Sequence, residues 1–303
     1  MKKNLTKLIA VILASILAGG LLSSCTTRSG SGLGLSSYHY DDAGKYNMGG
    51  DTLFMTEKAV NALEIDWISG EVEIIYHPED TIIFSETANQ ELDEDMTMRY
   101  WLDGNTLRIK FAKAGDWKFN NIQKSLTVYL PEKLTLNELE IDTTSAGVIA
   151  QGIRAMNVEI DTVSGGIDIS EAVVSDSFSA DTTSGQIVAM FAESLSELEI
   201  GTVSGGVQVS VSKLTEFDID STSGAINLSA ESAPKSGEIS TVSGSVELIL
   251  PETAEFTAGI STVSGQIESE IPLNKDGKYY ICGSGACRYE IDTTSGNISF
   301  RLR

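Results

Sequence analysis

Serine is the side chain whose spacing in this sequence most suggests chemistry. It recurs inside Thr-x-Ser-Gly, or a near copy of it, and the motif serines are Ser145, Ser164, Ser184, Ser204, Ser223, Ser243, Ser264 and Ser295. A serine nucleophile needs an adjacent base, most often histidine, to accept its proton. The chain has only two histidines, His39 and His77, and neither is near any of these eight serines in sequence. The repetition therefore predicts architecture, and we expect no enzyme activity and no cofactor.

Aspartate recurs at one position of the same motif, at Asp142, Asp161, Asp181, Asp220 and Asp292. If the copies stack, these carboxylates form a row that could hold Ca²⁺ at low affinity through oxygen ligands. The candidate ligands are Asp142, Asp161 and Asp181. Gly201, Ser240 and Ser261 interrupt the row, so a solvated acidic face is the other interpretation.

The charge of the whole chain excludes one class of partner. Its 303 residues carry 43 acidic and 21 basic side chains, a formal net charge of −22. Such a surface repels phosphate backbones, so we expect no nucleic-acid binding. Hydrophobic residues make up 41%, enough to bury a core.

The N-terminus has the pattern of an export signal. Lys2, Lys3 and Lys7 precede an uncharged apolar run over 8–22, which is shorter than the roughly 20 residues of a membrane span. Leu22, Ser23, Ser24 and Cys25 then resemble the bacterial lipobox. The resemblance implies cleavage before Cys25 and a diacylglyceryl group on its thiol, hence a lipid anchor outside the cytoplasm.

The elements that position the motif are short strands. The motif serines are spaced by 19, 20, 20, 19, 20, 21 and 31 residues, and a weaker ninth copy starts at Ile65. Apolar and polar residues alternate within each copy, which is typical of a β-strand. We attribute the Ser-Gly pair to a turn, because glycine tolerates backbone angles that other residues resist. One unit buries too few side chains to fold alone, so the units must stack.

The pattern predicts an all-β fold, a β-solenoid of about eight two-strand coils of about 20 residues, with an N-terminal β cap region. The motif isoleucines should form an inward ladder: Ile141, Ile160, Ile200, Ile219, Ile239, Ile260 and Ile291. The motif threonines and serines should form two hydroxyl stacks that bond to one another and to turn amides. A hydroxyl-lined binding groove is the alternative.

We divide the chain into a signal peptide (1–24), a flexible tether (25–50), an N-terminal β region or cap (51–138) and the solenoid (139–303). Tyr38, Tyr40 and Tyr46 could instead dock on the following domain. The cap region contains strand runs at 71–76, 81–85, 96–102, 106–111 and 125–130. A hairpin turn is expected at 103–105 and a solvated acidic loop at 86–95.

Two further groups of residues leave alternatives open. Trp101, Trp117 and Phe119 could form a sugar-binding surface or pack within the cap. Cys282 and Cys287 bracket a Gly-rich loop, and in an exported protein this favours a local disulfide, with free thiols as the alternative.

From 63 to the C-terminus, the chain resembles the bacterial β-strand-repeat proteins named the "putative adhesin" family, a family of unknown function. The residues that carry the resemblance are the copy from Ile65, the pair Leu130-Pro131 and the tandem Thr-x-Ser-Gly units. It implies a solenoid-like envelope protein and no catalytic residues.

We therefore expect a cell-envelope lipoprotein, an adhesin-like or scaffold module that binds a protein or a glycan. The alternatives are an accessory sensor in envelope-stress signalling and a polysaccharide-active β-helix enzyme. An acidic groove would repel uronate chains, which disfavours a lyase.

Overall fold

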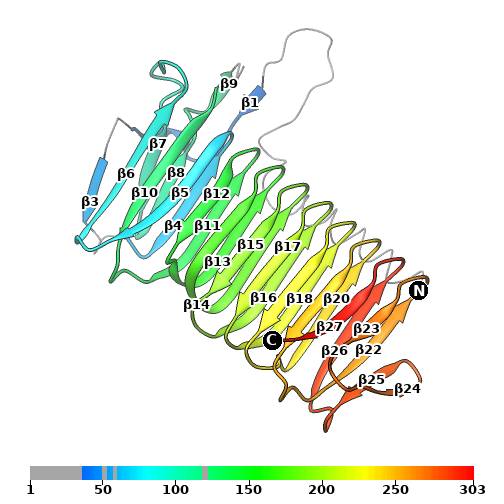
Figure 1. The fold of residues 1–303 in the computed structure, drawn as a ribbon. Helices are drawn as coiled ribbons and strands as arrows, with labels where there is room; N and C mark the ends of the chain where they lie inside the picture. The colour runs from blue at the N-terminus through cyan, green and yellow to red at the C-terminus, as the bar shows by residue number, and fades with distance from the viewer. Residues whose placement is uncertain (1–35, 50–52, 57–59, 118–121) are drawn as a thin grey trace, which may run out of the picture.

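The computed structural model describes residues 36–49, 53–56, 60–117 and 122–303. Strands dominate these residues, and the helical structure among them is the 3-10 turn η2 (Ala43–Lys45). None of the described residues belongs to a helix with the length and apolar character needed to cross a membrane. The expectation of an all-β stack of coils is confirmed (Figure 1).

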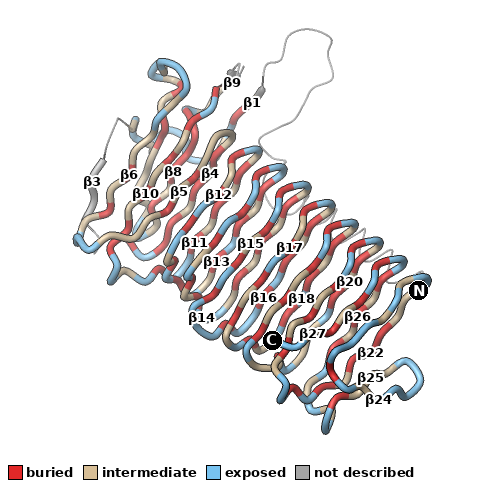
Figure 2. The backbone as a smooth tube through the Cα atoms, viewed as in Figure 1, coloured by how far each residue is buried: buried red, intermediate tan, exposed pale blue. Residues whose placement is uncertain are grey.

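Most strands belong to two sheets, here called sheet I and sheet II. Buried and more exposed residues alternate along these strands (Figure 2). Sheet I contains, in spatial order, β2 (Asn47–Met48), β7 (Arg99–Asp103), β8 (Thr106–Lys110), β4 (Ala62–Trp67), β11 (Leu136–Thr143), β13 (Arg154–Thr162), the second half of β14 (Ile167–Thr182), β16 (Leu195–Thr202), β18 (Leu214–Ser221), β20 (Ser236–Thr241), β26 (Cys287–Thr293), β22 (Phe256–Thr262), β25 (Tyr279–Cys282) and β24 (Asn274–Asp276).

Sheet II contains, in the same direction, β3 (Leu53–Thr56), β6 (Thr81–Ala88), β10 (Lys124–Pro131), β5 (Gly70–His77), β12 (Gly147–Gln151), the first half of β14, β15 (Ile187–Phe191), β17 (Val207–Val211), β19 (Ile226–Ala230), β21 (Val246–Leu250), β27 (Ile298–Leu302) and β23 (Ile267–Ser269). A separate pair joins β1 (Ser36–Tyr38) to β9 (Gly115–Trp117).

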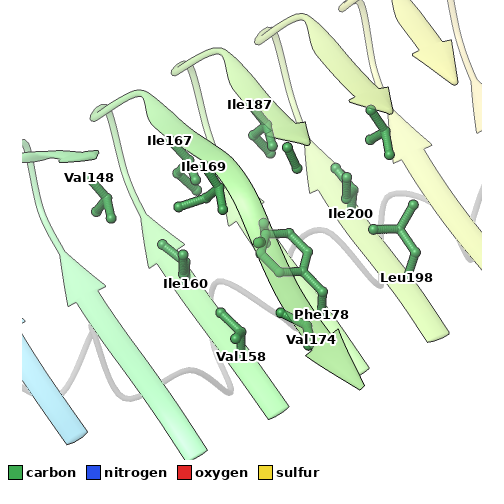
Figure 3. Packing of buried hydrophobic residues seen from close by; sticks show 14 of the residues in the cluster. Val148, Val158, Ile160, Ile167, Ile169, Val174, Phe178, Ile187, Leu198 and Ile200 are labelled. Carbon is green, nitrogen blue, oxygen red and sulfur yellow. The ribbon is translucent and has the colours of Figure 1, made fainter. Parts of the chain in front are cut away.

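Alternation along each strand builds the core. In β18, Phe217, Ile219 and Ser221 are buried, while the residues between them point outward. Neighbouring coils pair in parallel and in register, so the motif isoleucines form one buried row, with Ala180 in place of isoleucine in one coil. Residues of both sheets close the space between them (Figure 3). The predicted ladder is confirmed.

The motif threonine ties each corner together. The Thr162 hydroxyl accepts the amide hydrogen of Gly165 at 2.9 Å, and the same bond joins Thr202 to Gly205. The motif serines lie at the surface and donate across the coil boundary, as Ser223 does to the carbonyl of Val203 at 3.2 Å. The hydroxyls therefore bond to the backbone as expected, and the buried threonines line no groove.

The motif glycine is required for a reason that the sequence reasoning missed. Gly70, the motif glycine of the copy from Ile65, has a positive φ of 100° as the sequence reasoning expects, but Gly165, Gly185, Gly205 and Gly224 are not among the positive-φ glycines. A Cβ on Gly205 would instead overlap the carbonyl oxygen of Gly185 in the adjacent coil. A side chain at these four positions would force neighbouring corners apart, which is why the motif has glycine there; the first full copy, next to the coil of β4 and β5, has the buried Ala146 instead.

The spatial order of the coils departs from the sequence order at both ends. The last coil of the chain, β26 and β27, lies between the coil of β20 and β21 and the coil of β22 and β23, as the red strands in Figure 1 show. The first coil, β4 and β5, likewise lies between β8 with β10 and β11 with β12. The long 31-residue spacing contains the β24–β25 hairpin that precedes this return.

The N-terminal region therefore extends the stack as well as capping it. The strand runs and the hairpin turn are found as β5, β6, β7, β8 and β10, with Gly104 at φ 62° between β7 and β8. The expected solvated loop is wrong at its start, because β6 continues to Ala88 and its Glu86 is buried.

Two adjacent glycines test the corner. Gly205→Ala places a methyl group against the carbonyl of Gly185, so we expect a loss of about 3 kcal/mol in the free energy of unfolding measured with denaturant. Gly206→Ala is the matched control, because its nearest contact is an ordinary 3.9 Å to the carbonyl of Ala225, and its effect should stay within about 1 kcal/mol. Equal losses would show that the close approach is not what requires glycine.

Candidate functional site: an acidic face and its capped end

The outward residues of sheet I form parallel rows of carboxylates. One row contains Glu64, Glu140, Glu159, Ser179, Glu199, Asp218, Glu238, Glu290 and Gly259. The next contains Asp66, Asp142, Asp161, Asp181, Gly201, Asp220, Ser240, Asp292 and Ser261. Neighbours in a row are one strand spacing apart, about 4.8 Å, so like charges repel along the whole face.

Burial, and after it the acidic neighbours, raises the pKa of several carboxyl groups in the second row toward neutral pH. Burial, then Asp181 and Asp142, raises the pKa of Asp161 to about 7. Burial, then Glu140 and Asp66, raises the pKa of Asp142 to about 7. Asp181 follows with a pKa of about 6, raised by burial, Glu199 and Glu159. The face therefore gains negative charge within the physiological pH range.

Basic residues neutralise the rows at their ends. Lys110 in β8 lies 3.0 Å from the Glu64 carboxylate and 3.7 Å from that of Asp66, and Arg108 also pairs with Glu64. At the other end, Arg288 lies 3.1 Å from Glu290. The middle of the face therefore carries the unbalanced charge.

The three predicted cation ligands are consecutive members of one row. Asp142 pairs with Asp161, and Asp161 pairs with Asp181, so they share a face as expected. The Cα atoms of the outer two are two strand spacings apart, about 10 Å, so a shared ion would need these side chains to converge on it. Within the described residues, no three His, Cys, Asp or Glu side chains are grouped to hold a metal.

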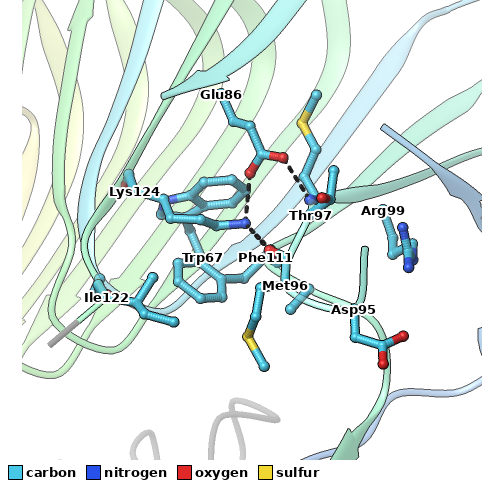
Figure 4. Close-up of polar contacts among 12 residues, drawn as sticks. Trp67, Glu86, Asp95, Met96, Thr97, Arg99, Phe111, Ile122 and Lys124 are labelled. Carbon is cyan, nitrogen blue, oxygen red and sulfur yellow. Dashed lines mark hydrogen bonds and ion pairs between the residues drawn. The ribbon is translucent and has the colours of Figure 1, made fainter. Parts of the chain in front are cut away.

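The N-terminal end of the stack is closed around a buried lysine. Lys124 is fully buried, and its ammonium donates to Glu86 at 2.6 Å, to the Met96 carbonyl at 2.8 Å and to the Phe111 carbonyl (Figure 4). It also lies over the Trp67 ring. Burial lowers the pKa of Lys124 to about 8, against the opposing effect of Glu86.

Sequence reasoning missed this ion pair, although a signal was present. In β10 the inward positions are Lys124, Leu126, Val128 and Leu130, so the alternation places a lysine in the core. The partner, Glu86, is 38 residues away on the paired strand β6, and no local pattern marks it.

The segment before β3 covers this same end. Tyr38 is buried and its hydroxyl accepts the amide hydrogen of Phe111, while Tyr40, Tyr46 and Trp101 form a chain of edge-to-face contacts. The alternative, in which this segment docks on the following domain, therefore holds for residues 37–48. The flexible tether expected at 25–50 does not include these residues. Trp101 packs within the cap; Phe119 and the side chain of Trp117 lie outside the described residues, as do the lipobox residues and Cys25.

The two cysteines near the C-terminus do not form the expected disulfide. Both Cys282 and Cys287 are free thiols. They pair with the same residue, Phe256, from opposite sides of β22, so their Cα atoms are about two strand spacings apart, about 9–10 Å. A disulfide accepts about 7 Å at most, so this bond would require the strands to move.

One cavity of about 290 Å³ lies on the outer face of sheet II near the C-terminal end. Its lining includes Asn227, Glu247, Glu268, Ser299 and Arg301, and no aromatic residue. Arg301 lies 3.5 Å from Glu247 and 3.2 Å from Glu268, so both carboxylates are held by one guanidinium.

Stacked two-strand coils, glycine-closed corners and a capped acidic sheet define an all-β repeat protein of the β-solenoid type. Residues 60–301 match the family described as Toastrack DUF4097, and the chain belongs to this family. No curated protein matches the chain.

Several solved structures are similar to the chain. A "putative lipid binding protein" from Parabacteroides distasonis is 17% identical, with a TM-score of 0.47, over 83% of this chain and 98% of that one. A "putative adhesin" from Bacteroides fragilis is 12% identical, with a TM-score of 0.43, over 82% and 95%. A "putative cell adhesion protein" from Clostridium sporogenes is 12% identical, with a TM-score of 0.26, over 86% and 100%.

The raised pKa values predict the pH dependence of stability. A carboxyl whose pKa is higher in the folded than in the unfolded chain stabilises the fold when protonated, and this stabilisation is lost as pH rises from about 4 to about 7. We therefore expect the Tm of Asp161→Asn to exceed that of the wild type at pH 7.5 and to converge with it near pH 4. Asp168→Asn is the control, because Asp168 lies between Ile149 and Val188 on sheet II. An equal gain at Asp168 would contradict the row-repulsion account.

The buried pair at the cap gives a second prediction. Lys124→Met leaves the Glu86 carboxylate buried without its partner, so unfolding should become about 3–5 kcal/mol more favourable in denaturant titrations. Adding Glu86→Gln to that variant should recover part of the loss. No recovery in the double variant would mean that the packing of the lysine stem, and not the charge, supplies the stability.

Proposed function

We propose that this protein is a non-catalytic lipoprotein of the bacterial cell envelope. It is anchored outside the cytoplasm through diacylglyceryl-Cys25 and presents its stack as an adhesin-like or scaffold module to a protein or glycan. The observation that carries the proposal is the pairing of a lipobox at Leu22–Cys25 with a rigid stack that begins to pack almost at once.

The length of chain between anchor and stack limits how far the N-terminal cap can lie from the membrane. Ten residues, 26–35, separate Cys25 from Ser36, the first residue of β1. Ten residues extend over no more than about 36 Å. The anchor therefore keeps β1 within about that distance of the membrane.

The two outer faces offer different chemistry to a partner. Sheet I presents carboxylates in rows, whereas one outward row of sheet II reads Glu73, Ile149, Asp168, Val188, Gln208, Asn227, Glu247, Ser299 and Glu268. Amide, hydroxyl and apolar groups interrupt the charges there. Sheet II therefore suits hydrogen bonding to a neutral glycan or a protein surface, and sheet I suits a basic partner.

The site chemistry favours binding over catalysis. A glycosidase needs two carboxyl groups that act independently, one as acid and one as base or nucleophile. In the sheet II cavity, Glu247 and Glu268 lie 3.5 Å and 3.2 Å from the same guanidinium, that of Arg301, so the two carboxyl groups are not independent of one another. The carboxylates of sheet I lie along a flat sheet in rows.

Lipidation is tested with a matched cysteine. In the full-length chain, Cys25→Ala should move the protein from the membrane fraction to the soluble fraction, and mass spectrometry should find no diacylglyceryl group. Cys287→Ala should leave fractionation unchanged. An unaltered membrane fraction, or an unmodified Cys25 in the wild type, would refute the anchor.

The binding role is tested separately. The released Cys25→Ala protein, applied to glycan and protein arrays, should bind a defined subset that substitutions on one outer face abolish. Turnover of any arrayed polysaccharide would contradict the non-catalytic assignment.

A further inference from the structure

The intercalated C-terminal coil occupies a slot between two other coils. On sheet I, β26 pairs in parallel with β20 on one side and with β22 on the other. On sheet II, β27 pairs with β21 and β23 in the same way. Residues 287–302 therefore complete the backbone ladders of both sheets, four strand pairings in all, which would be open without them.

The slot is shaped for one particular side chain. Tyr289 pairs with Gly237 on one side and with Ala258 on the other, so the two smallest apolar residues flank it. A Cβ on Gly237 would overlap the Phe217 ring, so this row has no room for a side chain there. The Tyr289 ring lies 5.3 Å from that of Phe256, and its hydroxyl donates to the Pro234 carbonyl at 2.9 Å.

Glu290 shows the same fit on the outer face. It pairs with Gly259, and its carboxylate lies where a Cβ on Gly259 would be. Without residues 287–302, Gly237 and Ala258 would flank an unfilled space next to Phe217 and Phe256. The slot is therefore complementary to this coil specifically, and the general motif does not explain the fit.

A short linker joins the coil to the rest of the stack. Residues 283–286 connect β25 to β26, and they include Gly283 at φ 57° and Gly285 at φ 73°. These four residues cross the end of β22, because Cys282 and Cys287 pair with Phe256 from its two sides. If the coil filled the same slot in another molecule, the linker is the part of this region whose conformation would have to change.

We propose that the slot is a strand-acceptor site for a second copy of this chain. Each copy places its residues 287–302 between β20 with β21 and β22 with β23 of the other, which makes a reciprocal, two-fold dimer. All contacts of Tyr289 and both backbone ladders are kept, and only the linker changes. The closed monomer and the exchanged dimer therefore contain the same interfaces, and linker length and protein concentration select between them.

Two cysteine pairs report which chain supplies the coil. Ser240 and Asp292 are directly paired across β20 and β26, at a spacing compatible with a disulfide. In the full-length chain with Cys25→Ser, Cys282→Ala and Cys287→Ala, we add Ser240→Cys and Asp292→Cys and oxidise. On non-reducing gels, the closed monomer gives a monomer band and the exchanged dimer gives a covalent dimer.

The length of the linker should determine whether the closed monomer or the exchanged dimer forms. Deleting Gly283–Gly285 leaves one residue between the strands, and two Cα–Cα steps span about 7.6 Å, which is less than the crossing of about 9–10 Å. The deletion should convert the cross-linked product from monomer to dimer. The matched control is Asp220→Cys with Ser240→Cys, whose strands β18 and β20 are neighbours within one chain, and it should give monomer bands with either linker.

A folded deletion variant that gives only monomer bands would overturn the proposal, and so would dimer bands from the control pair. If the deletion variant does not fold, the Ser240→Cys, Asp292→Cys protein with the intact linker tests the proposal instead. Refolding that protein at about 1 mM should produce an interchain Ser240–Asp292 cross-link that is absent after refolding at about 1 µM. Monomer bands at both concentrations would overturn the proposal.

Discussion

The contact of one coil's corner with the carbonyl oxygen of the next is the constraint on which the structure depends. At Gly165, Gly185, Gly205 and Gly224 the backbones of adjacent coils approach so closely that no Cβ fits. This contact holds successive coils at the strand spacing and in register. The threonine hydroxyl accepts a hydrogen bond from the amide of the glycine and so fixes the corner in one conformation, as Thr202 does for Gly205.

Because the coils stack in exact register, like charges repel one another on the outer surface. Every residue type that recurs in the motif is stacked on its own copy, so an aspartate that would be harmless on one strand becomes a row of like charges. The interruptions reduce this repulsion. The Asp181 carboxylate lies in the space that a Cβ on Gly201 would fill, and Ser240 hydrogen-bonds to Asp220, lowering a pKa that burial and acidic neighbours raise to about 7. Lys110 and Arg288 limit the rows at their two ends.

The period of the sequence was sufficient to predict the strands, the isoleucine ladder and the hydroxyls at the corners, because these features repeat in every coil. The order of the end coils could not be read from the same period, since any coil carrying the motif can pair with any other. That information lies in residues outside the motif, such as Gly237, Tyr289 and Ala258, which are far apart in sequence. Lys124 was similarly hidden, because its partner Glu86 comes from a strand with no repeat. At Gly165, Gly185, Gly205 and Gly224 the reason given for the motif glycine was wrong, because steric contact between coils leaves no local trace.

The first coil and the last coil both lie inside the stack and not at its ends, and this affects how the protein would respond to force. A pull on Arg303 acts on β26 and β27, which are hydrogen-bonded on both sides over most of their length, so two ladders must shear together before the chain extends. An outermost coil would instead peel away along a single ladder. For a molecule held at one end of its chain and loaded at the other, this topology favours mechanical resistance over stepwise unravelling.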